Sequence, residues 1–244
     1  MAASVCEVRN LTVQYGKRVA VDGLELDLHA GDVTLLLGPN GAGKSTALSA
    51  ISGALVPTSG TIRIAGCDLA TDPLRAKAKL GFADQPPALY EFLTVVEHLE
   101  FVAAARSAER GEVDRVMTRL QLTGIAQRPC RELSYGMRQR VGLAAALVGD
   151  VALVLLDETL NGLDPYAARS ARGAVEEVAA RGAAVLMSTH LLGGAERMCQ
   201  RAIIMDGGRV VADKSGEELA TLVAGGAGAL EELYVSVVPD RGPT

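Results

Sequence analysis

A nine-residue run has the spacing GxxxxGKS/T, the pattern of a loop that wraps around phosphate groups: Gly38, Pro39, Asn40, Gly41, Ala42, Gly43, Lys44, Ser45 and Thr46. Its glycines allow backbone N–H groups to turn inward without Cβ clashes. The Lys44 ammonium is placed to reach the β- and γ-phosphates, and the Ser45 hydroxyl is placed to ligate Mg²⁺. The run therefore predicts a nucleotide-binding site.

A second group of reactive residues ends a continuous apolar stretch. Residues 152–156 are all apolar and are followed by Asp157 and Glu158. A buried parallel strand delivers side chains to its C-terminal edge in this way. Asp157 is placed for Mg²⁺, directly or through water, and Glu158 is placed to polarise the water that attacks the γ-phosphate. Because the phosphate loop lies in the same chain, the pair predicts hydrolysis of ATP or GTP.

The elements that must position these groups alternate between strand and helix. The phosphate loop is preceded by an apolar strand at 33–37 and followed by a helix at 45–53. Later strands and helices alternate, which favours parallel strands joined by helical crossovers. We expect strands at 151–156, 183–188 and 201–205 and helices at 167–180 and from about Leu191.

Two regions depart from this alternation. The segments 5–8, 11–15 and 24–28 alternate apolar and polar residues, as half-buried antiparallel strands do, whereas 94–149 is helix-like almost throughout. We therefore predict an α/β fold: a P-loop NTPase core with a mixed sheet, an N-terminal antiparallel β-subdomain and an inserted α-helical lobe. The expected single domain has its core at about 1–85 and 151–223, the lobe at about 86–150 and a C-terminal tail at 224–244.

Composition narrows the function classes. A net charge of −5, 3% aromatic residues and no Trp argue against a broad nucleic-acid-binding face. The four cysteines lack C-x-x-C spacing, so a disulfide framework and a metal site are weak hypotheses. Although 49% of the residues are hydrophobic, no segment has about 18 uninterrupted apolar residues, and the N-terminus lacks a secretory signal pattern. We expect a cytoplasmic protein.

The order of the motifs resembles that of the ATP-binding subunit of an ABC transporter, over residues 5 to 235. The family order runs through an aromatic residue, the phosphate loop, a glutamine loop, a signature, an acid-ended strand, a D-loop and a switch histidine. The matching residues are Tyr15, 38–46, Gln85, 133–137, Asp157 with Glu158, 161–164 and 188–190.

The resemblance implies a role for each of these residues. Tyr15 stacks on adenine, and Gln85 joins Ser45 and Asp157 as a group that senses or binds Mg²⁺. Ser134 and Gly136 contact the ATP of the opposite subunit. The imidazole of His190 contacts the γ-phosphate beside the catalytic Glu158. In the family each ATP therefore lies between two subunits.

The chain departs from the family pattern in two places. Tyr135 and Met137 stand where the signature consensus LSGGQ has Gly and Gln, and Thr159-Leu160 replaces the usual Pro-Thr or Pro-Phe pair after Glu158. The second change puts the position of Glu158 in question. Neither change removes a catalytic group.

The resemblance implies an ATPase that dimerises around two ATP molecules and drives a separate integral membrane permease, most like those of drug, lipid or polysaccharide exporters. The dimer is a homodimer or pairs with a second ATPase cassette, peripheral on the inner face of the cell membrane. Residues 89–94 are where the family docks its membrane subunit. The alternative is a soluble ABC-type ATPase acting on a ribosome or nucleic acid, which usually carries two cassettes, coiled coils or zinc modules. A non-enzymatic regulator would lack Glu158 or His190, and both are present.

Overall fold

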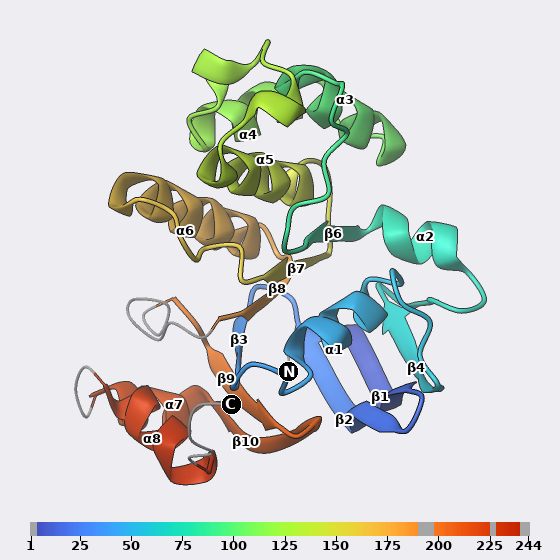
Figure 1. The fold of residues 1–244 in the computed structure, drawn as a ribbon, viewed down its shortest axis with the longest axis vertical. Coiled ribbons are helices and arrows are strands. Elements are labelled where there is room, and N and C mark those ends of the chain that lie inside the picture. The colour runs from blue at the N-terminus through green and yellow to red at the C-terminus, as the bar shows by residue number, and fades with distance from the viewer. Residues whose placement is uncertain (1–3, 190–197, 225–227, 240–244) are drawn as a thin grey trace.

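The computed structural model describes residues 4–189, 198–224 and 228–239, which build two sheets (Figure 1). The smaller sheet is antiparallel and has the strand order β2-β1-β4-β5. Its strands are β1 Ser4–Tyr15, β2 Arg18–His29, β4 Ser59–Ile64 and β5 Cys67–Asp68. Burial alternates along β1 and β2 because one face of this sheet is covered and the other is exposed.

The larger sheet has the order β10-β9-β3-β8-β7-β6, parallel except for the β9–β10 hairpin. Its strands are β3 Val33–Leu37, β6 Leu80–Ala83, β7 Leu153–Asp157, β8 Ala184–Ser188, β9 Arg201–Asp206 and β10 Arg209–Ser215. Every residue of β3, β7 and β8 is buried, which explains their largely apolar sequences.

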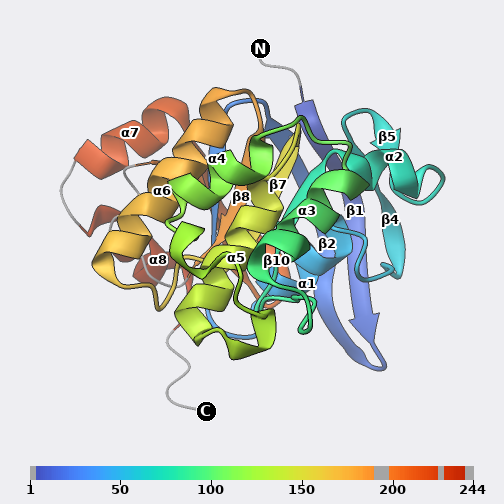
Figure 2. The same ribbon diagram turned by 90° about the horizontal axis from the view of Figure 1, so that it is seen from above.

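The helices surround the larger sheet, and α1 packs on both sheets through contacts with β1 and β7. Helices α3, α4 and α5 gather at one end, the top of Figure 1, away from the antiparallel sheet. The helices are α1 Lys44–Ile51, α2 Pro73–Ala78, α3 Val95–Ala105, α4 Glu112–Arg119, α5 Tyr135–Leu147, α6 Pro165–Ala180, α7 Gly216–Ala224 and α8 Ala229–Val237. Helix α5 contacts α3, α4 and α6, and α3 and α4 are stacked on the side of α5 that is farther from the sheet (Figure 1 and Figure 2).

Local chemistry fixes where several helices begin. Thr94 and Glu97 form a capping box at α3, in which each side chain accepts a hydrogen bond from the other residue's backbone N–H. Ser134 caps α5, and Asp164 caps α6 with Pro165 at the first position. These caps satisfy backbone donors that a helix leaves free.

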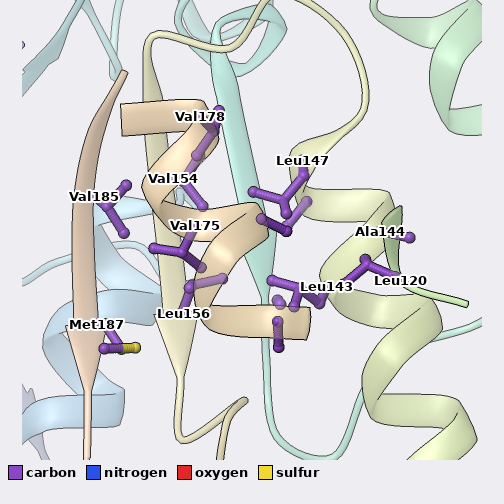
Figure 3. Close-up of a cluster of buried hydrophobic side chains, with 14 of the residues drawn as sticks. Leu120, Leu143, Ala144, Leu147, Val154, Leu156, Val175, Val178, Val185 and Met187 are labelled. Atoms are coloured by element: carbon purple, nitrogen blue, oxygen red, sulfur yellow. The ribbon is translucent and has the colours of Figure 1, made fainter. Parts of the chain in front are cut away.

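Strand β7 separates two hydrophobic clusters. Val154 and Leu156 face α5 and α6, where they pack with Leu147, Val175 and their neighbours (Figure 3). The alternate residues Leu153 and Leu155 belong to the other cluster, which joins α1 and the antiparallel sheet. The parallel sheet is therefore buried on both faces, and the acidic end of β7 is held rigidly between them.

The predicted fold class is confirmed, with both the mixed sheet and the antiparallel sheet in place. The structure adds helices α2, α7 and α8 and strands β5 and β10, which the sequence analysis did not predict. Leu230 of α8 is fully buried, so this part of the predicted tail packs on the core. The helix expected from about Leu191 lies outside the described residues, which omit 190–197. Among the described helices, none has the length and apolar character needed to cross a bilayer.

Candidate nucleotide site

The phosphate loop joins the end of β3 to the start of α1, and two of its glycines are required by close packing. A Cβ at Gly38 would lie 2.3 Å from the Met205 carbonyl oxygen, and a Cβ at Gly43 would lie 2.3 Å from the Ala20 carbonyl oxygen. Gly43 also has φ of 104°, a conformation that L side chains rarely adopt. Strands β9 and β2 therefore press directly against the loop backbone.

Lys44 is buried at the centre of this loop, with 5% of its surface exposed. Its ammonium donates hydrogen bonds to the carbonyl oxygens of Gly38, at 2.7 Å, and Pro39, at 3.1 Å. Burial lowers the pKa of Lys44, and the nearby carboxylates of Glu158 and Asp157 raise it to a smaller extent. The cation is thus held beside the acidic end of β7.

A cavity of about 350 Å³ opens over the loop, within the size range of small-molecule sites. Tyr15, at the end of β1, contributes a ring that is 52% exposed. The described residues that line the cavity are Tyr15, Arg18, Ala20, Asn40, Gly41, Ala42, Gly43, Lys44, Ser45, Thr46 and Glu158. An exposed aromatic ring, a glycine-rich helix N-terminus and a carboxylate therefore face one space.

The two acids at the end of β7 have different environments. Asp157 is buried and accepts a hydrogen bond from the Ser188 hydroxyl. The backbone N–H of Glu158 donates to the Ser188 hydroxyl at 3.0 Å, and the Glu158 side chain lines the cavity. Glu158 has φ of +47°, an uncommon left-handed conformation outside glycine that costs about 1–3 kcal/mol. The surrounding contacts hold this strained residue at the cavity.

A short hydrogen-bond chain supports the Glu158 carboxylate, and the sequence analysis did not foresee it. The Asn161 side-chain amide donates to Glu158 Oε2 at 3.4 Å, and the Thr189 hydroxyl donates to Asn161 Oδ1 at 3.3 Å. Asn161 lies in the segment after Glu158, and Thr189 follows β8. These two hydrogen bonds link the segments that follow β7 and β8 to the same carboxylate.

Thr159 fills the position where the family usually has Pro, and only 2% of it is exposed. Its hydroxyl lies 3.3 Å from the carbonyl oxygens of Ala83 and Asp157 and can donate to either. Ala83 ends β6, two residues before Gln85. The substitution therefore links the strand end before the glutamine loop to the acidic end of β7.

Several predicted site residues lie elsewhere. Gln85 follows β6 and is exposed, and it is not among the residues that line the cavity. Ser134 and Gly136 lie at the N-terminus of α5, outside the cavity, and a Cβ at Gly136 would meet no atom within 4 Å. Asp157 is buried and does not line the cavity, and His190 is outside the described residues. The structure brings together Tyr15, the phosphate loop and Glu158.

Arg18 lines the cavity, although the sequence motifs do not include it. It is the first residue of β2 and pairs across the hairpin with Tyr15. The signal available in the sequence was the short spacing between Tyr15 and Arg18 around Gly16, which is typical of a tight hairpin turn.

A phosphate loop after a parallel strand, with an acid-ended strand in the same sheet, defines a P-loop nucleotide-binding protein. The ABC transporter family matches residues 21–161, and the chain belongs to this family. The predicted resemblance is thereby confirmed, and the protein is an ATP-binding cassette with ATPase activity.

Named relatives cover most of the chain. It is 33% identical to the Nod factor export ATP-binding protein I of Cupriavidus metallidurans, over 88% of this chain and 73% of that protein. It is 30% identical to the lantibiotic transport ATP-binding protein SrtF of Streptococcus pyogenes, over 93% and 95%. It is 33% identical to the daunorubicin resistance ATP-binding protein DrrA3 of Streptomyces coeruleorubidus, over 92% of this chain and 72% of that protein.

Solved structures agree with this assignment. An ATP-binding subunit of an ABC transporter superposes with a TM-score of 0.87 and 32% identity, over 96% of this chain and 99% of that chain. A bacterial ABC transporter cassette solved as a dimer superposes with a TM-score of 0.79 and 25% identity, over 86% and 98%.

Proposed function

We propose that this chain binds ATP in the cavity at Lys44, hydrolyses it with Glu158, and drives a separate membrane permease of the exporter type. The observation that carries the proposal is that the Glu158 carboxylate and the phosphate loop line one cavity. The export direction is supported by relatives named for Nod factor export, lantibiotic transport and daunorubicin resistance. These relatives do not favour the alternative of a ribosome or nucleic-acid ATPase.

Each residue of the cavity has a distinct task in this proposal. The Tyr15 ring stacks on adenine, and the backbone N–H groups of the loop and the Lys44 ammonium hold the phosphates. The Glu158 carboxylate accepts a hydrogen bond from the attacking water and orients it toward the γ-phosphate. His190 is proposed to contact the same phosphate. The side chain of Asn161 keeps Glu158 in its orientation.

The oxygen donors near the loop fit Mg²⁺. Ser45 offers a hydroxyl in the cavity, and Asp157 offers a carboxylate at the end of β7. Among the described residues, no group of three or more His, Cys, Asp or Glu could hold a metal alone, which suits an ion shared with nucleotide phosphates. When bound, Mg²⁺ neutralises phosphate charge. We propose Ser45, Asp157 and Gln85 as the residues that would hold or sense it.

The N-terminus of α5 supplies the second half of a composite site. Ser134 is exposed, and the bare backbone at Gly136 leaves N–H groups open to an anion. Neither residue lines the cavity of its own chain. We propose that they contact the γ-phosphate held by a second cassette, either an identical subunit or a related one.

A second surface suits the membrane partner. A groove of about 390 Å³ lies between α2, β6 and α3, and its exposed aromatic residues are Tyr90, at 53%, and Phe101, at 51%. Their rings are 4.9 Å apart in an edge-on arrangement. Within the predicted docking segment 89–94, Leu89 packs against the core instead of facing outward. We propose that a cytoplasmic helix of the permease lies in this groove, which holds the cassette on the inner face of the membrane.

An ion pair links this docking segment to α5, the helix that begins within the signature. The Arg138 guanidinium of α5 lies 2.6 Å from a Glu91 carboxylate oxygen and also donates to the Cys130 carbonyl oxygen at 3.0 Å. The pair lowers the pKa of Glu91 through the hydrogen bond from Arg138. A displacement of the segment by the permease would therefore be passed to α5, which carries Ser134.

The decisive experiment uses the Glu158→Gln variant, which keeps the size of the side chain and removes its charge. Hydrolysis should fall by roughly 10²–10⁴ while ATP binding survives. Light scattering should show dimers with ATP and monomers with ADP. A variant that hydrolyses ATP at the wild-type rate contradicts the role of Glu158, and one that stays monomeric at saturating ATP contradicts an identical partner.

Mixed subunits test the composite site itself. Ser134→Arg and Lys44→Ala subunits should each be inactive alone. A mixed dimer keeps one site in which the loop and the signature are both intact, so mixing should restore part of the activity. Continued inactivity counts against a shared site. Purification from detergent-solubilised membranes, followed by identification of the co-purifying membrane protein, tests the permease partner.

A further inference from the structure

Arg18 lines the nucleotide cavity together with the aromatic ring of Tyr15 and the phosphate loop. Tyr15 and Arg18 are directly paired across the β1–β2 hairpin, and directly paired residues share one face of the hairpin. Both residues line the cavity. One guanidinium nitrogen of Arg18 lies 3.5 Å from the point where a Cβ on Gly41 would stand. The side chain therefore reaches from the hairpin to the tip of the phosphate loop.

Among the residues that the structure describes, Arg18 has no acidic partner that would explain this placement. In the described part of the chain, no ion pair includes Arg18. The carboxylate of Asp22, four residues later on β2, is already held by Arg209 at 2.6 Å. Glu158 is the one carboxylate among the described residues that line the cavity. An anion bound in the phosphate loop would face the unpaired guanidinium.

We propose that Arg18 binds the phosphate chain of the nucleotide and so raises the affinity of the cavity for ATP and ADP. This inference rests on the proposed assignment of the cavity to ATP. A guanidinium suits the task because it presents paired N–H donors that match phosphate oxygens and it stays charged. Arg18 is exposed, so water weakens the contact and the expected contribution is modest.

A contact with the adenine base is the competing role for the same side chain. The structure favours phosphate because the guanidinium approaches Gly41 of the loop. The cation–π contact found among the described residues joins Arg131 to Phe92, at 5.4 Å, and does not involve Arg18 or Tyr15. If Arg18 contacts the phosphates, its replacement should weaken ATP and GTP alike. If it contacts the base, the loss of affinity should differ between the two nucleotides.

The test is a calorimetric titration of ATP, ADP and GTP into wild type, Arg18→Gln, Arg18→Lys and Lys17→Gln. Lys17 is the matched control because it is the exposed cation next to Arg18 in the same turn, and it does not line the cavity. Arg18→Gln should weaken all three nucleotides about tenfold, and Lys17→Gln less than about twofold. Arg18→Lys should recover part of the loss because it restores the charge. Turnover at saturating ATP should stay within about twofold of wild type for the control Lys17→Gln.

Two results would overturn the inference. Wild-type affinity in Arg18→Gln, or an equal loss in Lys17→Gln, would show that Arg18 makes no specific contact. A loss that is large for ATP and absent for GTP would assign Arg18 to the base instead. Lys44→Ala separates this failure from failure of the proposed site. If Lys44→Ala abolishes binding while Arg18→Gln keeps the wild-type affinity, the cavity still binds ATP and the role of Arg18 alone is wrong.

Discussion

The nucleotide cavity and the groove beside α3 are built by opposite means. The cavity depends on backbone: strands β9 and β2 press carbonyl groups against Gly38 and Gly43, so that no side chain fits there. The groove depends on side chains: Tyr90 and Phe101 stand half-exposed over buried neighbours. A site made of backbone tolerates few residue types, whereas a site made of side chains can be altered residue by residue.

Because of this difference, the residues that bind ATP can stay the same while the residues that select the membrane partner change. Any ATP-binding cassette must present the same N–H groups to the same phosphates, so the backbone of the cavity is fixed by its ligand. The groove needs only to match one permease helix, which its aromatic side chains can do without changing the fold. Substitutions at the two sites should therefore have different consequences.

The largest expected effect comes from Gly43→Ala, which breaks the cavity. The new methyl group would collide with the Ala20 carbonyl oxygen, and φ at this residue is 104°. We expect ATP affinity to fall at least about 100-fold, because the loop must shift away from its phosphate-binding geometry.

Gly182→Ala is the matched control for backbone strain. Gly182 has a similar φ of 102°, but a Cβ there would meet no atom within 4 Å. This control should lose about 1 kcal/mol of stability and keep its ATP affinity, as measured by thermal unfolding and titration. Equal ATP affinity in the two variants would show that the packing of β2 against the loop is unimportant.

Substitutions in the groove should weaken binding of the permease and leave the reaction with ATP unchanged. Phe101→Ser removes an aromatic side chain that packs on Tyr90, and Phe92→Ser removes one that is 82% exposed outside the groove. Phe101→Ser should weaken co-purification with the permease about tenfold or more and leave the basal ATPase of the isolated chain unchanged. Phe92→Ser should retain the permease. Equal retention in both variants would move the docking surface away from the groove.

A smaller effect, confined to turnover, should follow from Asn161→Ala. The amide of Asn161 donates to Glu158, so its loss should leave the carboxylate less well oriented. We expect kcat to fall about tenfold with ATP affinity unchanged, since one hydrogen bond of about 1 kcal/mol is removed next to the strained residue. Measurement of kcat and KM separately checks this, and a matching loss of affinity would point to a general structural defect.

The cavity was largely predictable from sequence because its backbone demands particular residues. The run 38–46 and the acid pair after β7 follow from glycine spacing and from an apolar strand that ends in carboxylates. Short elements such as α2 lacked a clear periodic signal. The roles of Arg18 and Asn161 depend on strand pairing and on neighbouring loops, which residue type alone does not reveal.

The environment of His98, in the groove, could not be predicted from the sequence either. As a single His at a helical position its sequence says nothing about its environment, yet the structure leaves only 2% of it exposed. Neither ring nitrogen has a hydrogen-bond partner among the described residues, and the Tyr90 ring lies 5.7 Å away. The charged residues that line the groove are Lys77 and Arg106, and no carboxylate lines it in the described structure. A proton on this ring would therefore be poorly stabilised.

The smallest predicted effect is a pH dependence of stability that His98 contributes. Burial lowers the pKa of His98 below its ordinary value of 6.5. Below pH 6.5 the imidazole is protonated in the unfolded chain but still neutral in the folded chain. The contribution of His98 to the free energy of unfolding is therefore fully present above pH 6.5 and is lost as the pH falls toward the folded pKa. From pH 7.5 to 5.5, the free energy of unfolding measured with urea should fall more for wild type than for His98→Leu. Parallel losses in the two proteins would contradict the lowered pKa, because they would mean that the imidazole takes up its proton equally in the folded and the unfolded chain.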